Sequence, residues 1–155
     1  MSLPSVSKDA QLNAPPDQVF DALTRPEQLT QWFAQRVEVD VRPEGGWTFD
    51  WPPHMQARGR YLAVERPHRL VWTWDASIPD SRPDTFQEDA HPPVTMEYTF
   101  APEDGGTRLT IVESGHVDDE AAARNGEGLE MTIQGLRAYL EDGVTIDWDT
   151  LPQPE

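Results

Sequence analysis

A serine, a histidine and a glutamate lie close together near the end of the last expected strand. The segment Ser114-Gly115-His116 places the serine and the histidine two residues apart, where side chains on a strand point to the same side. Nucleophilic catalysis also needs a third group that orients the base, and the sequence indicates none. We therefore predict no catalytic residues, and the pattern favours a binding protein over an enzyme.

Glu113 is the carboxylate best placed for acid–base chemistry. Strand alternation puts it with Leu109 and Ile111, on the side expected to face the core. Because an isolated buried charge is costly, such a carboxylate needs a cationic partner. Two positions stay open for it, one inside the core and one at the open rim of the sheet. The candidate partners are Arg58, Arg60 and Arg137.

Metal chemistry has little support in the pattern of histidines and acids. The four histidines show no ligand spacing such as H-x-x-x-H. Residues 117–120 are acidic but lack the glycine and the spacing of a calcium loop, and they are more typical of a solvated surface or a helix start. We expect neither a metal nor another cofactor. The histidines are His54, His68, His91 and His116.

Large apolar side chains recur at every second residue in three segments, which is the spacing of one face of a strand. A further stripe at 129–140 repeats at helical spacing and would lie opposite them. Two interpretations stay open, an ordinary core or the lining of a pocket. The alternating residues are Trp47, Phe49, Trp51, Leu70, Trp72, Trp74, Val94, Met96, Tyr98 and Phe100.

Two short helices are predicted near the start of the chain. Pro15 and Pro16 suit a first helical turn, where the missing N–H has no partner to lose. Pro26 would end the first helix and begin a second, and Thr24 and Glu27 have capping-box spacing. Each helix carries one apolar face that would pack on the core. These faces comprise Val19, Phe20 and Leu23, then Leu29, Trp32 and Phe33.

Alternation predicts a first strand over 5–14 and a meander of six more. In the first hairpin two glycines, at 45 and 46, can take positive φ. The proline-rich segment 75–93 lacks periodicity, and we expect residues 75–92 to be mobile. A helix over 119–142 would begin regularly at about Glu127, delayed by Asn125, Gly126 and Gly128. The six strands are 37–41, 46–51, 55–67, 69–74, 93–100 and 107–114.

Length and composition limit the class of protein. With 155 residues the chain can form one core, and we expect one domain over 1–142 with a tail over 143–155. The absence of cysteine excludes disulfides and fits a reducing compartment. A net charge of −16 repels nucleic acid and anionic membranes. No signal peptide or membrane span is indicated, so we expect a cytoplasmic protein.

Several motifs in order carry a family resemblance: VFDAL after Ala14-Pro15, then RPEQLTQWF, RPHRLVWTW, GGTRLTIVESG and GEGL. From about Lys8 to Asp142 the chain resembles the Hsp90 ATPase activator homologue 1-like (AHSA1-like) family of the START and Bet v 1-like group. The resemblance implies an α+β helix-grip fold, in which a curved antiparallel sheet wraps a long C-terminal helix. Leu129 and His116 depart from it, because the family tends to show aromatic residues there.

The resemblance implies binding of a small hydrophobic or amphipathic ligand in a cavity between the sheet and the last helix. Two alternatives stay open: a protein-interaction module that regulates a chaperone ATPase in the stress response, and a cyclase or hydrolase with unidentified catalytic residues. The partner would be a small molecule, a chaperone or another protein, and the chain a monomer or homodimer. Candidate pocket residues are Trp47, Phe49, Trp51, Tyr61, Trp72, Trp74, Met96, Tyr98, Ile111, Glu113, Leu129, Ile133 and Leu136.

Overall fold

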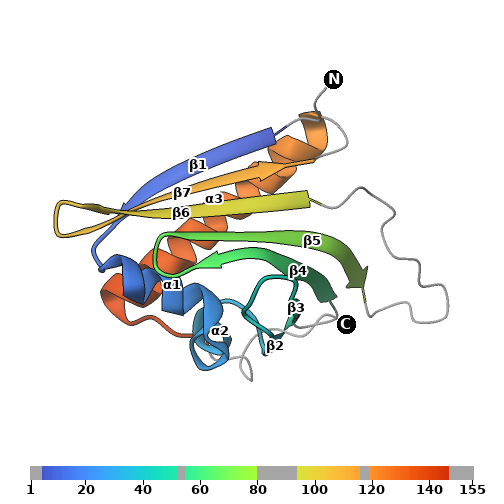
Figure 1. The fold of residues 1–155 in the computed structure, drawn as a ribbon, viewed down its shortest axis with the longest axis horizontal. Helices are drawn as coiled ribbons and strands as arrows, with labels where there is room; N and C mark the ends of the chain where they lie inside the picture. Colours follow the sequence, from blue (N-terminus) through green and yellow to red (C-terminus); the bar gives the residue numbers. More distant parts are fainter. Residues whose placement is uncertain (1–4, 52–54, 80–93, 116–118, 147–155) are drawn as a thin grey trace.

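The computed structural model of the chain describes residues 5–51, 55–79, 94–115 and 119–146. These residues form a seven-stranded antiparallel sheet in the order β1-β7-β6-β5-β4-β3-β2. The two short helices lie at one end of the sheet, and the long helix lies across one face, the predicted α+β helix-grip arrangement (Figure 1). The elements are β1 Ser5–Leu12, α1 Pro16–Thr24, α2 Pro26–Trp32, β2 Arg36–Val39, β3 Gly46–Trp51, β4 Met55–Glu65, β5 Arg69–Pro79, β6 Val94–Glu103, β7 Gly106–Ser114 and α3 Asp119–Asp142.

Proline sets the boundary between the two short helices. Arg25 is extended, with φ −86° and ψ 126°, because the residue before a proline avoids helical backbone. The indole Nε1 of Trp32 donates a hydrogen bond of 2.9 Å to the carbonyl oxygen of Ala22 and ties α2 to α1. The predicted capping box is wrong. Arg25 caps α2, whereas Thr24 ends α1 and its hydroxyl donates to the carbonyl oxygen of Phe20.

The turn between β2 and β3 reaches across to β4. Its residue with positive φ is Glu44, at 69°, and not one of the two glycines as predicted. Gly45 is needed for another reason, since a Cβ there would lie 1.9 Å from the carbonyl oxygen of Asp40. The backbone N–H of Glu44 donates to the Tyr61 oxygen over 2.7 Å, and the Tyr61 N–H donates to the Gly45 oxygen over 2.8 Å. The turn therefore fixes the backbone of Tyr61.

Strands β4 and β5 pair further than the sequence predicts. Pairing continues to Met55 and Pro79, so β5 extends past the expected end at residue 74. β5 continues because β4 supplies backbone hydrogen-bond partners beyond residue 74, although the apolar alternation of β5 ends at that residue. The register shifts on either side of residues 59–61, as it does at β-bulges. Of the residues expected to be mobile, 75–79 lie in β5, and 80–92 lie outside the described residues.

Helix α3 is continuous and packs most closely on β1. Its predicted delay to about Glu127 is wrong, because Gly126 lies inside the helix. A Cβ at Gly126 would lie 3.1 Å from Cγ2 of Val6, so the missing side chain lets α3 approach the inner face of β1. Leu140 of the predicted stripe is half-buried, and the other three members are fully buried. These are Leu129, Ile133 and Leu136.

Past α3 the chain turns back towards α2. The backbone N–H of Ile146 donates a hydrogen bond of 2.7 Å to the carbonyl oxygen of Gln31. The rest of the expected tail, residues 147–155, lies outside the described residues. The division into a domain over 1–142 and a tail over 143–155 stays a prediction.

Candidate functional site

Four side chains form a row across adjacent strands on the face that α3 covers. The register pairs Tyr61 of β4 with Trp72 of β5, Trp72 with Met96 of β6, and Met96 with Glu113 of β7. Register partners in adjacent strands point to the same side of the sheet. All four side chains are buried. We call Tyr61, Trp72, Met96 and Glu113 the cross-strand row.

Two side chains of the row carry polar atoms without a hydrogen-bond partner. Oη of Tyr61 and Nε1 of Trp72 are buried, and no described residue pairs with either. Their rings are direct neighbours, parallel to within 2° and 6.0 Å apart between centroids. Burial raises the pKa of the Tyr61 hydroxyl, which therefore keeps its proton. Leaving a buried donor unpaired costs about 1–3 kcal/mol.

The other buried tryptophans of the described chain do have partners. Nε1 of Trp47 donates to the carbonyl oxygen of Thr73 over 3.0 Å, and Trp32 donates to Ala22. Indole N–H groups are normally paired when buried. Trp72 is therefore an exception within this fold and requires an explanation.

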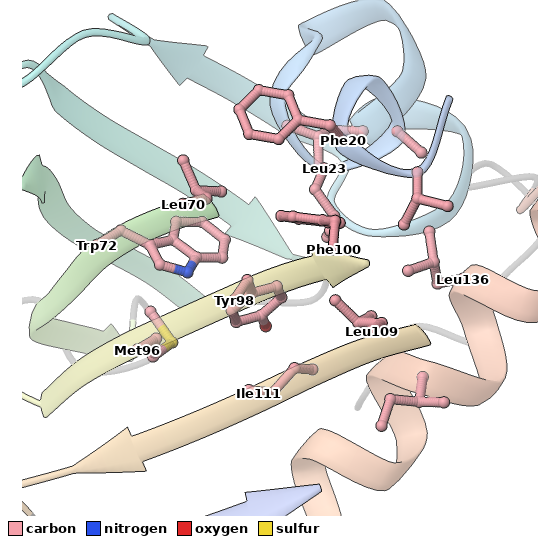
Figure 2. Close-up of a cluster of buried hydrophobic side chains, with 14 of the residues drawn as sticks. Phe20, Leu23, Leu70, Trp72, Met96, Tyr98, Phe100, Leu109, Ile111 and Leu136 are labelled. Carbon is pink, nitrogen blue, oxygen red and sulfur yellow. The ribbon is translucent and has the colours of Figure 1, made fainter. Parts of the chain in front are cut away.

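The row lies within an aromatic cluster. Trp72 meets Tyr98 at a centroid distance of 5.5 Å and an interplanar angle of 80°. It meets Trp47 at 5.7 Å, and Trp47 stacks on Phe49 at 4.7 Å. Figure 2 shows Trp72, Met96 and Tyr98 beside one another on β5 and β6. The surroundings of the two unpaired donors are thus aromatic and apolar.

The row lies one register pair inside the margin of the core. The next pair on the same face of β5 and β6 is Trp74 with Val94, and both are half-buried. Trp74 also packs against Trp47 at a centroid distance of 5.4 Å. A molecule arriving from solvent at this end would pass this pair before reaching Trp72 and Met96.

Glu113 ends the row on β7 and is only 5% exposed. Of the two positions left open for Glu113, the one inside the core is confirmed and the one at the open rim is wrong. Burial raises the pKa of Glu113 from 4.5 to about 7, so the carboxyl exchanges its proton near neutral pH. The pKa of the Tyr98 hydroxyl is raised mainly by burial and further by the charge of Glu113. A carboxyl of this kind can donate or accept a hydrogen bond.

The three arginines predicted as partners of Glu113 lie elsewhere. Arg58 and Arg60 are exposed on β4, which is separated from β7 by β6 and β5. Arg137 donates to the carbonyl oxygen of Gln11 over 3.3 Å. Alternation could place Glu113 on the inner face, but it could not show where the long arginine side chains extend.

The first half of α3 lies over the Glu113 end of the row. Val6 is the register partner of Glu113 and nearly touches α3 at Gly126. Leu129 follows Gly126 by less than one helical turn and is buried. Leu129 is therefore the residue of the apolar stripe nearest to this end.

The second half of α3 packs at the other end of the core. Leu136 is fully buried, and Figure 2 shows it on the side of Leu23 and Phe100, away from Trp72. This end holds tightly packed rings and aliphatic chains, such as Phe100 against Phe20 at a centroid distance of 5.4 Å. We place the candidate site at the row and not at Leu136.

Most of the predicted pocket residues are brought together on the inner face. Their role as the lining of a pocket stays a prediction, and the side chain of Trp51 is not described. Sequence reasoning missed Gly126 as a residue that sets the distance between α3 and β1. The available signal was a glycine inside an apolar helical pattern. The residues brought together are Trp47, Phe49, Tyr61, Trp72, Trp74, Met96, Tyr98, Ile111, Glu113, Leu129, Ile133 and Leu136.

Metal binding and serine–histidine catalysis have no geometric support among the described residues. Within residues 5–51, 55–79, 94–115 and 119–146, no group of three or more acidic or histidine side chains could hold a metal ion. His68 is exposed, whereas His54, His91 and His116 lie outside the described residues. The pairing of Ser114 with His116 therefore lies outside them as well. None of the described helices has the length and apolar composition needed to cross a membrane.

Known proteins share this fold and this sequence pattern. Residues 13–141 match the family described as "Activator of Hsp90 ATPase homolog 1-like protein" (AHSA1). The chain is 21% identical over 141 residues to the uncharacterized protein C1711.08 of Schizosaccharomyces pombe, covering 91% of this chain but only 38% of that protein. It therefore spans well under half of that relative's length.

Two solved structures show the same fold at low sequence identity. DynU16, a protein of the dynemicin biosynthetic locus, has a TM-score of 0.76 at 22% identity, over 93% of this chain and 50% of that chain. The Aha1 dimer from Colwellia psychrerythraea has a TM-score of 0.69 at 13% identity, over 91% of this chain and 98% of that chain. Because the family match covers most of the sequence, this chain belongs to the AHSA1-like family.

Proposed function

We propose that the chain binds a small hydrophobic or amphipathic molecule between the inner face of the sheet and α3, at the end that holds the cross-strand row. The observation that carries this proposal is the pair of unpartnered donors, Tyr61 Oη and Trp72 Nε1. A phenylalanine would fill the ring space at Tyr61 without leaving a polar atom unpaired. Leaving these two donors unpaired therefore costs free energy, whereas a bound ligand can accept hydrogen bonds from them.

The surroundings of the two donors support this proposal. Small-molecule sites are mainly apolar and aromatic with a few placed polar groups, and the row combines two donors with Glu113 and an aromatic cluster. DynU16, which shares the fold, is a protein of a biosynthetic locus. That setting agrees with a role in handling small molecules.

Binding can be tested with a panel of fatty acids, sterols and aromatic compounds. A compound that binds beside Trp72 should change tryptophan emission and raise Tm, because it binds only the folded state. Native mass spectrometry of the purified protein would show any small molecule that copurifies. If no compound changes emission or Tm and nothing copurifies, the proposal is wrong.

A pair of substitutions on α3 localises the site. Leu129→Trp adds bulk beside the row and should weaken binding by about tenfold or more, equivalent to about 1.4 kcal/mol. Met131→Trp adds the same ring two positions later, where the side chain is 73% exposed, and should leave binding unchanged. Equal effects of the two substitutions would place the ligand elsewhere.

The family description favours a second candidate, a protein-interaction module that regulates a chaperone ATPase. In that case the purified chain should change ATP hydrolysis by Hsp90 without any small molecule, and Leu129→Trp should have no effect on it. A monomeric or homodimeric state belongs to either proposal, and the Colwellia relative is described as a dimer. A cytoplasmic location is also proposed, in keeping with a chain that has no cysteine.

A further inference from the structure

We infer that Trp74 is the gate residue that a ligand must pass to reach the cross-strand row, and that rotation of its indole ring sets how fast the ligand enters and leaves. This inference rests on the proposed function, because a gate needs a ligand to pass it. It concerns the rates of exchange and not the chemical class of the ligand. Trp74 thereby has a different role from the residues that would contact the bound molecule.

Trp74 lies on the inner face at the margin of the core, one register pair beyond Trp72. It is half-buried, whereas Trp72 is only 3% exposed. Its register partner on β4 is Gly59, which has no side chain, and its partner on β6 is the half-buried Val94. Trp74 thus carries the only large side chain at these three positions. A molecule that crosses the margin at these strands therefore meets the Trp74 ring first.

Two other boundaries of the core show closer packing. At the end near α1, the rings of Phe20 and Phe100 pack with centroids 5.4 Å apart. On the side of β1, α3 approaches so closely that a Cβ at Gly126 would lie 3.1 Å from Cγ2 of Val6. Of these three boundaries, the margin at Trp74 is therefore the most open to a ligand.

The Trp74 ring is held in place by an aromatic contact that rotation can break. It packs edge-on against Trp47, with centroids 5.4 Å apart and 68° between the ring planes. Trp47 is only 2% exposed, and its Nε1 donates to the carbonyl oxygen of Thr73 over 3.0 Å. Moving Trp47 would therefore break a hydrogen bond as well as the packing. The contact thus joins a fixed ring to a half-buried ring that can rotate about its side-chain bonds.

A gate residue and a contact residue affect binding differently. Trp74 lies one register pair outside Trp72, so its ring is placed to obstruct passage. A ligand passes the same ring on entry and on exit, so removal of the ring raises the association and dissociation rate constants by the same factor. The dissociation constant, which is their ratio, then stays unchanged. Loss of a contact residue instead raises mainly the dissociation rate constant.

Stopped-flow fluorescence with N-phenyl-1-naphthylamine, a neutral probe whose emission rises in apolar surroundings, measures both rate constants. We expect Trp74→Ala to raise each of them by about three- to tenfold, the effect of releasing a ring held closed by one aromatic contact. Kd should stay unchanged. Trp74→Phe keeps a smaller ring and should give intermediate rates. Val94→Phe adds a ring on the next strand of the same margin and should lower both rate constants.

Tyr139→Ala is the matched control for a general loosening of the fold. Tyr139 is also half-buried and also packs on a buried tryptophan, with its ring centroid 6.4 Å from that of Trp32. It belongs to the second half of α3, which packs at the other end of the core. Tyr139→Ala should lower Tm much as Trp74→Ala does, but it should leave both rate constants unchanged. Equal acceleration by the two variants would mean that exchange follows local unfolding, and the gate would be wrong.

The outcomes separate this inference from the proposed function. If Trp74→Ala weakens binding through the dissociation rate constant alone, Trp74 contacts the ligand, and the gate is wrong while ligand binding stands. Unchanged rate constants in Trp74→Ala and Val94→Phe would place the entry elsewhere. If the probe does not bind but a compound of the panel does, tryptophan emission gives the same two rate constants for that compound. If neither the probe nor any compound of the panel binds, both proposals are wrong.

Discussion

Tyr61 and Trp72 place two hydrogen-bond donors where packing alone needs none, and removing one of them should be favourable in the free protein. Tyr61→Phe deletes a hydroxyl that has no partner, so the free energy of unfolding should rise by about 1 kcal/mol. Urea denaturation without ligand measures this change. Tyr139→Phe instead removes a hydroxyl that has a partner and should lower the free energy by about 0.5–1.5 kcal/mol. A loss of stability in Tyr61→Phe would show that its hydroxyl is paired.

Glu113 should make the folded protein less stable as the pH rises from 5 to 8. Its pKa is raised from 4.5 to about 7, so between these values the folded state binds a proton that the unfolded state lacks. The stabilisation from that proton is complete below pH 4.5 and is lost as the pH passes 7. The full cost of ionisation is about 3 kcal/mol, and Glu113→Gln should remove most of this slope.

Urea denaturation of wild type and Glu113→Gln at several pH values between 5 and 8 measures the difference. Glu103→Gln is a suitable control, because the hydrogen bond from Arg108 lowers the pKa of Glu103 and moves its titration below this range. The pH slope of the control should match that of the wild type. A Glu113→Gln slope equal to that of the wild type would mean that Glu113 is ionised throughout.

At the scale of the elements, the junction of β3, β4 and β5 depends on the absence of a side chain at Gly59. A Cβ there would lie 1.8 Å from the carbonyl oxygen of Thr73 and 2.7 Å from Cζ2 of Trp47. The same carbonyl oxygen accepts the hydrogen bond of the Trp47 indole. Gly59 thus allows Trp47 to lie across β4 and reach β5, next to the cross-strand row.

Gly59→Ala should therefore destabilise the fold by about 1–3 kcal/mol or more, since the clash is with backbone and cannot be relieved by a rotamer change. Gly46→Ala is the control, because the nearest atom to its Cβ would be 3.8 Å away. Thermal and urea unfolding measure both variants. Near-equal stabilities would contradict the close approach of Trp47 to β4.

The periodicity of apolar residues predicts the helices and strands but not the contacts between them. The strands and helices of the described residues follow from alternation, prolines and the stripe on α3, since each signal is local. The end of β5 could not be predicted, because pairing with β4 extends it past its own apolar pattern. The inner position of Glu113 was predictable, whereas the unpaired state of Trp72 was not. The unpaired state of Trp72 depends on which groups three neighbouring strands bring together.

At the scale of the whole molecule, acidic residues outnumber basic ones, so repulsions between like charges outnumber attractions between opposite charges. The sequence has 28 acidic and 12 basic residues, a net charge of −16. Several arginines already form surface ion pairs, such as Arg66 with Asp21 at 2.9 Å and Arg108 with Glu103 at 2.7 Å. Salt weakens these attractions, but exposed pairs contribute only about 0–1 kcal/mol each. The excess of acidic residues leaves many repulsions that salt also weakens.

We therefore expect the free energy of unfolding to increase by on the order of 1 kcal/mol between 20 mM and 500 mM sodium chloride, because screening acts on exposed charges of either sign and the repulsive pairs are more numerous. Urea denaturation at constant pH measures this increase. Glu130→Lys changes an exposed residue of α3 and brings the net charge from −16 to −14, so its salt-dependent gain should be smaller. A free energy that falls with added salt would show that the arginine ion pairs outweigh the general repulsion.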